Sequence, residues 1–478
     1  MRNHLVKTTL SRPSRDSNLD IPIVIIIIII IIMSVKHEVH PTEIRTSISP
    51  SLVVWLNTTG ALANYATEAG STAVVMFCYY GSWATYRQGE GTFNVADIDA
   101  TLCSHLVYAF AGVSSEGLIE SLDPYNDLSD NWGKGSFNKF SALAKTNPDV
   151  KTLLAIGGWN HGSVTFSNDN FVLLLSTLKE YLHAEDLLLT VAVAASTQVL
   201  EESYNISGIA ENTDYISVMT FDYHTASEDS VTGINSPLDP LATDTGENLK
   251  KNIKASIAAW VDGGAPKSKL LVGFPLYGRT FTLASSADTE IGAQTSGPGE
   301  PGVYTQEAGY LGFYEICTKL ITEGDSWTSV YDADSATLYA YNDDQWVTFD
   351  DVKTFTTKAN YVVEEGLGGA MVWPVETDDF HGICSGIKNP LQKLIKSILK
   401  SLSREATVHV RCVWKDALNY HPLLLSGPAK EMEVMTVLVG ISTMMITGST
   451  AFITHGPATI DPRELRLLFY KVVFCSRI

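Results

Sequence analysis

The stretch Lys151–Gly158, with the sequence KTLLAIGG, is a short apolar run that ends in two glycines. An apolar run of this length, bounded by residues that favour turns, is typical of a buried β-strand. Strands that alternate with helices predict a parallel sheet of βα units, and the chain shows this alternation from Val75 to about Lys400. Six further runs of the same kind are VVMFCYY from Val74, HLVYAFAG from His105, LLLTVAVAA from Leu187, YISVMTFD from Tyr215, KLLVGFPLYG from Lys269 and GGAMVWP from Gly368.

Three regions depart from this βα pattern. Residues 282–365 are rich in Gly, Thr, Tyr and Asp and too long for a simple loop, which predicts a small α+β insertion before the last strand. Residues 34–74 are polar without a clear period and predict a linker. Residues 401–478 predict an irregular extension, in which 435–454 carry no charge but are diluted by Thr, Ser and Gly, so that they make at most a weak membrane span.

Residues 1–33 form a leader whose apolar part runs from Ile21 to Met33, interrupted only by Pro22. This part is too short for a membrane helix, which needs ~20 apolar residues. It fits the apolar region of an export signal, preceded by basic residues. The unbroken isoleucines Ile25–Ile32 are also what a translated simple repeat would produce, so an artefactual leader is the alternative.

The composition bounds the class of protein. The chain has 478 residues, of which 45% are hydrophobic and 10% aromatic, enough for a large core. Its formal charge of −20 repels phosphate backbones and anionic membranes, so neither nucleic acid nor a membrane is an expected partner. None of the six cysteines lies in a C-x-x-C pair, so no metal or other cofactor is expected. Six cysteines allow 15 disulfide pairings or scattered buried thiols.

Five segments follow the strand-like runs in order: CYYGSWATYR from Cys78, LLAIGGWN from Leu153, MTFDYH from Met219, GFPLYGRTF from Gly273 and GGAMVWPVETDDF from Gly368. Together they resemble glycoside hydrolase family 18, a family of TIM-barrel chitinases and chitinase-like proteins. The resemblance covers roughly residues 75–395 and implies a (β/α)8 TIM barrel with an active site at the carboxyl ends of its strands. It also implies chitin or chito-oligosaccharides as the ligand.

The resemblance also implies which residues contact the sugar. Trp373 would form the floor of the subsite beside the scissile bond, since pyranose rings stack on aromatic faces. Four further aromatic residues would line the same cleft: Tyr79, Trp83, Phe110 and Trp159. Each aromatic taken alone is about as well explained as core filling, and a surface salt bridge is the alternative for the arginine. The residues expected to bind substrate are Tyr79, Trp83, Phe110, Trp159, Met219, Asp222, Tyr223, Tyr277, Arg279 and Trp373.

Smaller features follow from the same resemblance. Gly157 and Gly158 match a strand end at which missing side chains let backbone approach closely, and an ordinary turn at the end of the strand is the alternative. Phe221 stands where the family has a tyrosine, so a hydroxyl that would contact the acetamido group is absent. The implied disulfides are Cys78–Cys103 and Cys317–Cys384, which leaves Cys412 and Cys475 unpaired. The tripeptides that start at Asn57 and Asn205 fit glycosylation of an exported protein.

The catalytic segment of the family is missing. Its fourth strand carries D-x-x-D-x-D-x-E, and this sequence contains no such motif. Only 31 positions separate Trp159 from Thr190, whereas one βαβ crossover needs ~30 residues and two need about twice that. One βα unit is therefore expected to be absent, and a seven-stranded barrel should have a gap or an exposed edge. Asp378 and Asp379 follow the last strand and are expected at most to line the cleft.

The sequence therefore predicts a secreted, extracellular chitinase-like protein that binds chitin and has no catalytic residue, a pseudoenzyme. The alternative is an incomplete version of an active endochitinase whose natural transcript restores the fourth strand. A membrane-anchored interaction protein that uses 435–454 has the least support.

Overall fold

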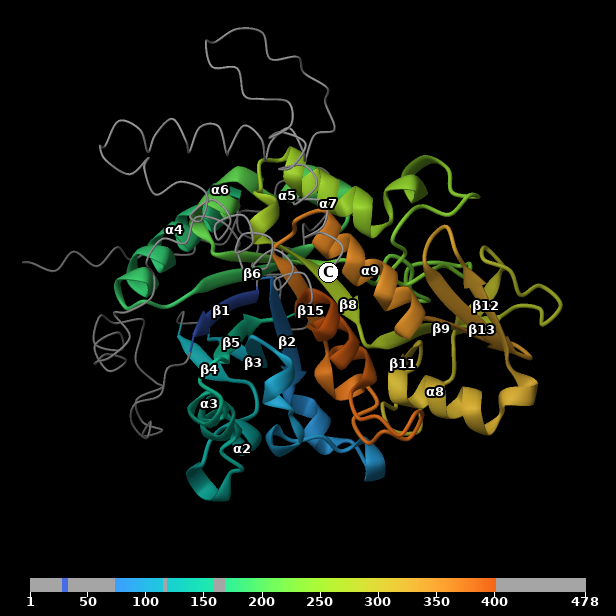
Figure 1. The fold of residues 1–478 in the computed structure, drawn as a ribbon, viewed down its shortest axis with the longest axis horizontal. Coiled ribbons are helices and arrows are strands. Elements are labelled where there is room, and N and C mark those ends of the chain that lie inside the picture. Colours follow the sequence, from blue (N-terminus) through green and yellow to red (C-terminus); the bar gives the residue numbers. More distant parts are fainter. Residues whose placement is uncertain (1–27, 33–73, 115–117, 159–167, 401–478) are drawn as a thin grey trace, which may run out of the picture.

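The computed structural model describes residues 28–32, 74–114, 118–158 and 168–400, and its strands curl into a barrel surrounded by helices (Figure 1). Each of the seven predicted runs forms one parallel barrel strand, which confirms the α/β barrel fold. These strands are β2 (Val75–Gly81), β3 (His105–Val113), β5 (Lys151–Gly157), β6 (Leu189–Ala194), β7 (Tyr215–Met219), β8 (Leu270–Pro275) and β15 (Gly369–Trp373).

The barrel closes on itself. The strands follow the order β2-β15-β8-β7-β6-β1-β5-β3, and pairing of β2 with β3 completes the ring. A short strand, β4 (Ile119–Ser121), pairs antiparallel with β3. Between β5 and β6 the described residues form one helix, α4 (Asn168–Ala184), and no further parallel strand.

The prediction of a gap in the barrel is wrong. The position between β5 and β6 is filled by β1 (Ile28–Ile32), which comes from the N-terminal leader and is drawn dark blue in Figure 1. This strand is antiparallel to both neighbours, with Ile28 opposite Gly157 of β5 and Ala192 of β6. The physical reason is that unpaired strand edges leave backbone N–H and C=O groups without partners, and a run of β-branched residues readily supplies them.

The helices cover the outside of the barrel. None within the described ranges is long and apolar enough to cross a membrane, and residues 401–478, with the weak span 435–454, lie outside those ranges.

Besides α4, the α-helices are α2 (Pro124–Asp127), α3 (Ser136–Thr146), α5 (Thr197–Ser203), α6 (Ile206–Asn212), α7 (Ile253–Asp262), α8 (Phe313–Thr322) and α9 (Val352–Glu364). The 3-10 helices are η2 (Ser82–Tyr86), η3 (Gly89–Gly91), η4 (Val95–Asp97), η5 (Ala100–Leu102), η6 (Asp130–Trp132), η7 (Gly246–Lys250), η8 (Lys267–Lys269), η9 (Gly324–Ser326) and η10 (Val375–Thr377).

Polar side chains fix where the last two barrel helices begin. Asn252 accepts a hydrogen bond from the backbone N–H of Ala255 at the start of α7. Asp351 accepts from the N–H groups of Lys353 and Thr354 at the start of α9. Such caps satisfy N–H groups that have no partner within the helix and typically contribute about 1 kcal/mol each.

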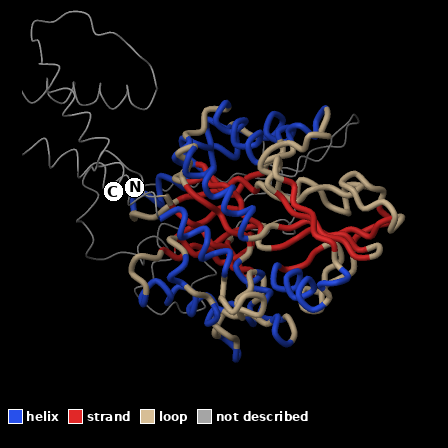
Figure 2. Tube along the Cα trace, turned by 45° about the vertical axis from the view of Figure 1, so that its right-hand side comes forward, coloured by secondary structure: helices blue, strands red, loops and turns tan. Residues whose placement is uncertain are grey.

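A second, antiparallel sheet projects from one side of the barrel, as the strands at the right of Figure 2 show. It begins slightly before the predicted insertion, because β9 follows β8 after a single residue, and its strands end before α9, which returns to the barrel. Helix α8 lies between its strands in the sequence. The strands are β9 (Tyr277–Leu283), β10 (Thr295–Pro298), β11 (Tyr310–Gly312), β12 (Thr328–Asp332), β13 (Thr337–Asn342) and β14 (Gln345–Phe349).

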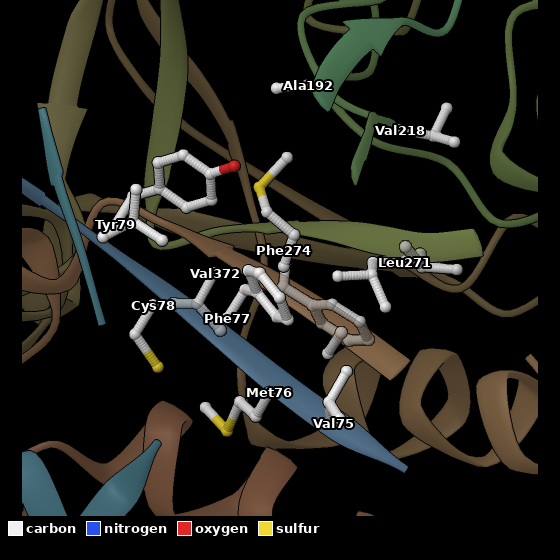
Figure 3. Packing of buried hydrophobic residues seen from close by; sticks show 14 of the residues in the cluster. Val75, Met76, Phe77, Cys78, Tyr79, Ala192, Val218, Leu271, Phe274 and Val372 are labelled. Carbon is white, nitrogen blue, oxygen red and sulfur yellow. The ribbon is translucent and has the colours of Figure 1, made fainter. Parts of the chain in front are cut away.

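The barrel core is apolar and closely packed. Phe77 of β2, Leu271 and Phe274 of β8 and Val372 of β15 are fully buried and gather between neighbouring strands (Figure 3). The ring of Phe274 meets that of Phe355 in α9 at 5.1 Å between centroids, which ties a strand to its covering helix. Such packing holds the strand ends in place, and the strand ends carry the candidate site.

Both implied disulfides are present. Cys78 of β2 is joined to Cys103 just before β3, and Cys317 of α8 is joined to Cys384 after β15. The first bridge links two adjacent barrel strands, and the second ties the insertion to the barrel. Cys412 and Cys475 lie outside the described residues.

Candidate functional site

The predicted site residues lie on neighbouring strands. Tyr79 is in β2, Trp373 ends β15 and Met219 ends β7. Tyr277 begins β9, one residue after the end of β8. The four strands β2, β15, β8 and β7 are consecutive in the barrel. Since the carboxyl ends of parallel strands meet at one mouth of a barrel, the candidate residues form an arc around that mouth.

Three aromatic rings contact that of Trp373. We call the four residues the aromatic cluster: Trp373, Tyr79, Trp83 and Phe110. The centroid of the Trp373 ring lies 5.8 Å from that of Tyr79, 5.9 Å from that of Trp83 and 5.8 Å from that of Phe110. Trp83 and Phe110 also stack on each other at 6.0 Å. The structure thus brings together four of the five aromatic residues that the sequence placed in the cleft, and the fifth, Trp159, lies outside the described residues.

The members of the aromatic cluster differ in their access to solvent. Tyr79 is 1% exposed, and its hydroxyl donates to Ser217 Oγ of β7 at 3.5 Å, across the barrel. Trp373 and Phe110 are half-buried, and Trp83 is 42% exposed. Tyr79 therefore supports the cluster from below, while the other three rings retain a face that a ligand can reach.

Gly158 is approached closely by a side chain, whereas the resemblance implied close approach of backbone. Its φ of +97° favours glycine, and a Cβ at this position would lie 3.0 Å from the ring of Phe110. The ring therefore packs directly against the backbone at the end of β5, which sets the position of Phe110 beside Trp373.

Asp222 anchors a polar network on the same arc. Its Oδ1 accepts hydrogen bonds from the Tyr277 hydroxyl and from Arg279 Nε, both at 2.7 Å, and its Oδ2 accepts from Arg279 Nη2 at 2.7 Å. Arg279 therefore forms a salt bridge, as the alternative for this residue held, but its partner is another candidate site residue. The bidentate geometry is the strong form of this pair.

Two tyrosines surround the guanidinium of Arg279. Its Cζ lies 5.2 Å from the ring centroid of Tyr277 and 5.5 Å from that of Tyr310, and the two rings stack at 4.6 Å. Burial acts to lower the pKa of Arg279, but its bonds to Asp222 outweigh this and raise it. Burial, followed by the charge of Asp222, raises the pKa of Tyr277 well above its usual value. At neutral pH Arg279 is therefore a cation and Tyr277 is a neutral phenol.

The backbone at Asp222 is held in an unusual conformation. Its φ is +60°, in the left-handed region that non-glycine residues seldom adopt. Its N–H donates to Oδ1 of Asn235, which is buried at 1% exposure. Sequence reasoning missed Asn235, which carries no motif; its Nδ2 also donates to the backbone carbonyl of Tyr277 at 3.5 Å, so it contacts two members of the network.

The neighbours of Asp222 have different surroundings. Met219 is half-buried at the end of β7, and the ring of Phe221 meets that of Tyr277 at 6.1 Å. Tyr223 is buried, and its hydroxyl shares a hydrogen bond of 2.7 Å with Ser256 of α7. That bond gives Tyr223 a role in joining the strand end to its helix, so we leave it out of the proposed binding surface.

The carboxylates after β15 do not line a cleft, which corrects the expectation for Asp378 and Asp379. Both are fully buried. Asp378 accepts from the backbone N–H groups of Asp379 and Gln392, and Asp379 accepts from those of Gly382, Ile383 and Cys384. Backbone N–H groups thus occupy both carboxylates.

Glu376 is a further buried carboxylate that sequence reasoning missed, although it lies in the quoted segment GGAMVWPVETDDF. Its Oε2 accepts from the N–H of Gly81 at 3.1 Å, and Arg87 donates to its backbone carbonyl at 3.2 Å. Arg87 Nη2 is 3.8 Å from Oε1. Burial raises the pKa of Glu376 to about 7, against the lowering effect of Arg87 and Gly81. The pair holds η2, which carries Trp83, against the segment after Trp373.

The fourth-strand position contributes no acid to the mouth. The described residues there are the isoleucines of β1, and Ile28 at the start of this strand lies opposite Gly157 at the end of β5. Glu376 is fully buried and bound to Gly81, so it is not placed to protonate a ligand in the cluster. Among the described residues the mouth thus has stacking surfaces and a polar network, but no accessible carboxylic acid at the position between β5 and β6.

The sequence matches the family model "Glycosyl hydrolases family 18" over residues 75–169 and 165–378. It is 33% identical to "Chitotriosidase-1" of Mus musculus over 393 residues, which cover 71% of this chain and 81% of that protein. The structure resembles the Group IV chitinase of Ostrinia furnacalis, with a TM-score of 0.65 and 37% identity over 68% of this chain and 99% of that one. It also resembles human YKL-39, described as "a pseudo-chitinase with retained chitooligosaccharide binding properties", with a TM-score of 0.63 and 32% identity over 68% of this chain and 100% of that one.

Proposed function

This chain belongs to glycosyl hydrolase family 18, and we propose that it is a secreted chitinase-like protein that binds chitin or chito-oligosaccharides without hydrolysing them. One observation carries the proposal: the aromatic cluster and the Asp222 network are assembled, while isoleucines occupy the position of the catalytic strand.

The aromatic cluster suits a pyranose ring. The axial C–H groups of a sugar present an apolar face, and Trp373 offers a partly exposed indole that three further rings hold in place. Trp83, at 42% exposure, extends this surface. A rigid aromatic surface is favourable for binding because little side-chain entropy is lost when the ligand arrives.

The polar network suits the edge of the same sugar. The side chains of Asp222 and Arg279 are 33% and 20% exposed, so both retain groups that a ligand can reach. Asp222 can accept from an amide N–H or a hydroxyl, and Arg279 can donate to a carbonyl or hydroxyl oxygen. Their mutual bonds fix both groups before the ligand binds, and Phe221 supplies no hydroxyl to assist them.

The absence of hydrolysis follows from the chemistry of the family. Its enzymes use the acetamido oxygen of the substrate as the nucleophile, while a glutamate protonates the leaving oxygen. Without that acid the leaving group departs as an alkoxide, and loss of a general acid typically lowers the rate ~10²–10⁴-fold. Human YKL-39 is a precedent in the family for binding without activity, in the words of its description.

Export is supported by two features of the chain that do not depend on the leader. The two disulfides are typical of oxidising compartments, and Asn57 and Asn205 begin glycosylation tripeptides. The expected location is therefore extracellular.

An active endochitinase is the second candidate, and one observation favours it. The family match comes in two segments that meet at residues 165–169, in the region where the fourth-strand motif would stand. Sequencing the natural transcript between the codons for Trp159 and Thr190 distinguishes the two candidates. An additional segment with D-x-x-D-x-D-x-E would make this protein a hydrolase.

The proposed function is tested with the purified chain on chitin beads and on a fluorogenic chitobioside. The chain should be retained on chitin, and Trp373→Ala should abolish retention. Trp132→Ala is the matched control, because Trp132 is 96% exposed and lies outside the aromatic cluster. Product release that survives removal of contaminating chitinases would refute the lack of activity. Equal retention of the Trp373→Ala variant and the parent chain would refute the binding site.

A further inference from the structure

The two strands that flank β1 depend on it for half of their pairing. β5 pairs with β1 and β3, and β6 pairs with β1 and β7. In the described residues β5 and β6 do not pair with each other. Without β1, Leu153–Gly157 and Leu189–Ala192 would each have an open edge whose backbone groups lack partners.

The chemistry of these edges selects the occupant. Leu153, Ala155, Leu189 and Val191 are all buried at 1% exposure or less. A segment that pairs with both edges must therefore be extended, apolar, rich in β-branched residues and free of proline. Within the chain, the isoleucine run Ile25–Ile32 meets these requirements.

The length of chain between β1 and β2 allows a segment of the same molecule to fill the position. Two strands separate β1 from β2 in the barrel, a distance of about 15 Å. The 42 residues from 33 to 74 are more than enough to cover it, because a fully extended chain needs only about five residues for this distance. A tether of this length keeps the segment at a high effective concentration, which favours the molecule's own segment over one from a second copy.

We propose that the gap between β5 and β6 is a strand-acceptor site and that its occupant is the chain's own segment Ile28–Ile32. This segment replaces the missing fourth strand in the backbone ladder without replacing its catalytic side chains. The site completes the barrel whether or not the aromatic cluster binds sugar, so it does not rest on the proposed function.

This role conflicts with removal of the leader. If a signal peptidase cleaved after residue 33, the released segment would carry away the eighth strand and open both edges. A protein that uses this site must therefore keep Ile28–Ile32, and its purified N-terminal peptides should include them.

A disulfide trap tests the proposal directly. Ile30 lies opposite Ala155, and antiparallel partners at this spacing meet the geometry of a disulfide. In a full-length chain in which Cys412 and Cys475 are serine, Ile30→Cys with Ala155→Cys should form an intramolecular bridge, detected by peptide mass mapping. Ile30→Cys with Val272→Cys is the control, because β8 is not a neighbour of β1. Absence of the first bridge, equal formation of the control bridge or a bridge between two copies would each overturn the assignment.

A second measurement requires no new cysteine. Ile30 pairs with Ala155 and Thr190, so Ile30→Pro removes a ladder donor, whereas Ile30→Val keeps the strand. Hydrogen exchange in β5 and β6 should accelerate about tenfold or more in the proline variant and remain unchanged in the valine variant. Exchange in β8 reports on overall folding. Equal exchange of the two variants in β5 and β6 would overturn the proposal.

Discussion

Glu376 should make the stability of this protein depend on pH. This carboxyl is fully buried after Trp373, and burial raises its pKa from the usual 4.5 to about 7. In the folded chain it therefore keeps its proton up to about pH 7, while in the unfolded chain it loses the proton near pH 4.5. Between these values the folded state binds more protons, so the stability that Glu376 contributes is fully present below pH 4.5 and is lost as the pH rises through 7.

The magnitude follows from the size of the shift. A pKa raised from 4.5 to about 7 corresponds to about 3 kcal/mol between the two protonation states. Glutamine resembles the protonated acid in shape but does not ionise. Relative to the parent chain, Glu376→Gln should therefore gain about 3 kcal/mol of unfolding free energy between pH 4.5 and pH 8. Asp378, whose pKa burial raises to about 6, is unchanged in both proteins and cancels in the comparison.

Urea unfolding at pH 5, 6, 7 and 8 measures this difference. Glu228→Gln is the matched control, because it makes the same chemical change at an exposed position. The difference in unfolding free energy between Glu376→Gln and the parent should rise from pH 5 to about pH 7 and then level off, while that of the control stays flat. A constant difference for Glu376→Gln would refute the view that burial, rather than the pair with Arg87, dominates this carboxyl.

Three further predictions follow from the same structure. Arg279→Lys keeps the charge but loses the bidentate fork to Asp222, so calorimetry with chitopentaose should show affinity about tenfold weaker; unchanged affinity would exclude the network from binding. Gly158→Ala places a Cβ against Phe110 at a positive φ, so chitin retention should fall while the circular dichroism of the barrel persists; full retention would show that the ring can move at no cost. Lys358→Met removes the cation that donates to buried Asp350, so urea unfolding should show a free energy of unfolding that is about 3–5 kcal/mol lower. A loss below about 1 kcal/mol would contradict the view that this buried pair is stabilising.

Local sequence was a sufficient guide to most of the barrel. Each of the seven parallel strands was predicted from an apolar run with a turn residue at its end, because burial on both faces requires such a run. The aromatic cluster was predicted from motifs at the ends of those runs, since the ends of parallel strands must meet. Gly158 was predicted as a position of close approach, but the group that approaches it is the ring of Phe110 and not backbone.

Contacts between distant segments were beyond such reasoning. Glu376 and Arg87 are 289 positions apart, and nothing in either local pattern indicates that one is buried against the other. Asp378 and Asp379 follow the last strand and were expected at most to line the cleft, but the backbone of a later segment binds both. The conformation of Asp222 likewise depends on Asn235, which local patterns do not mark.

By itself, the sequence determined the chemistry that the mouth contains and the chemistry that it lacks. Aromatic rings, an aspartate and an arginine follow the strands, and no D-x-x-D-x-D-x-E segment exists to supply an acid. Only the tertiary structure decided how the barrel closes, because nothing in the local pattern pairs the isoleucine run with two strands that lie far along the chain. Backbone groups buried at the edges of β5 and β6 need partners, and Ile28–Ile32 supplies them.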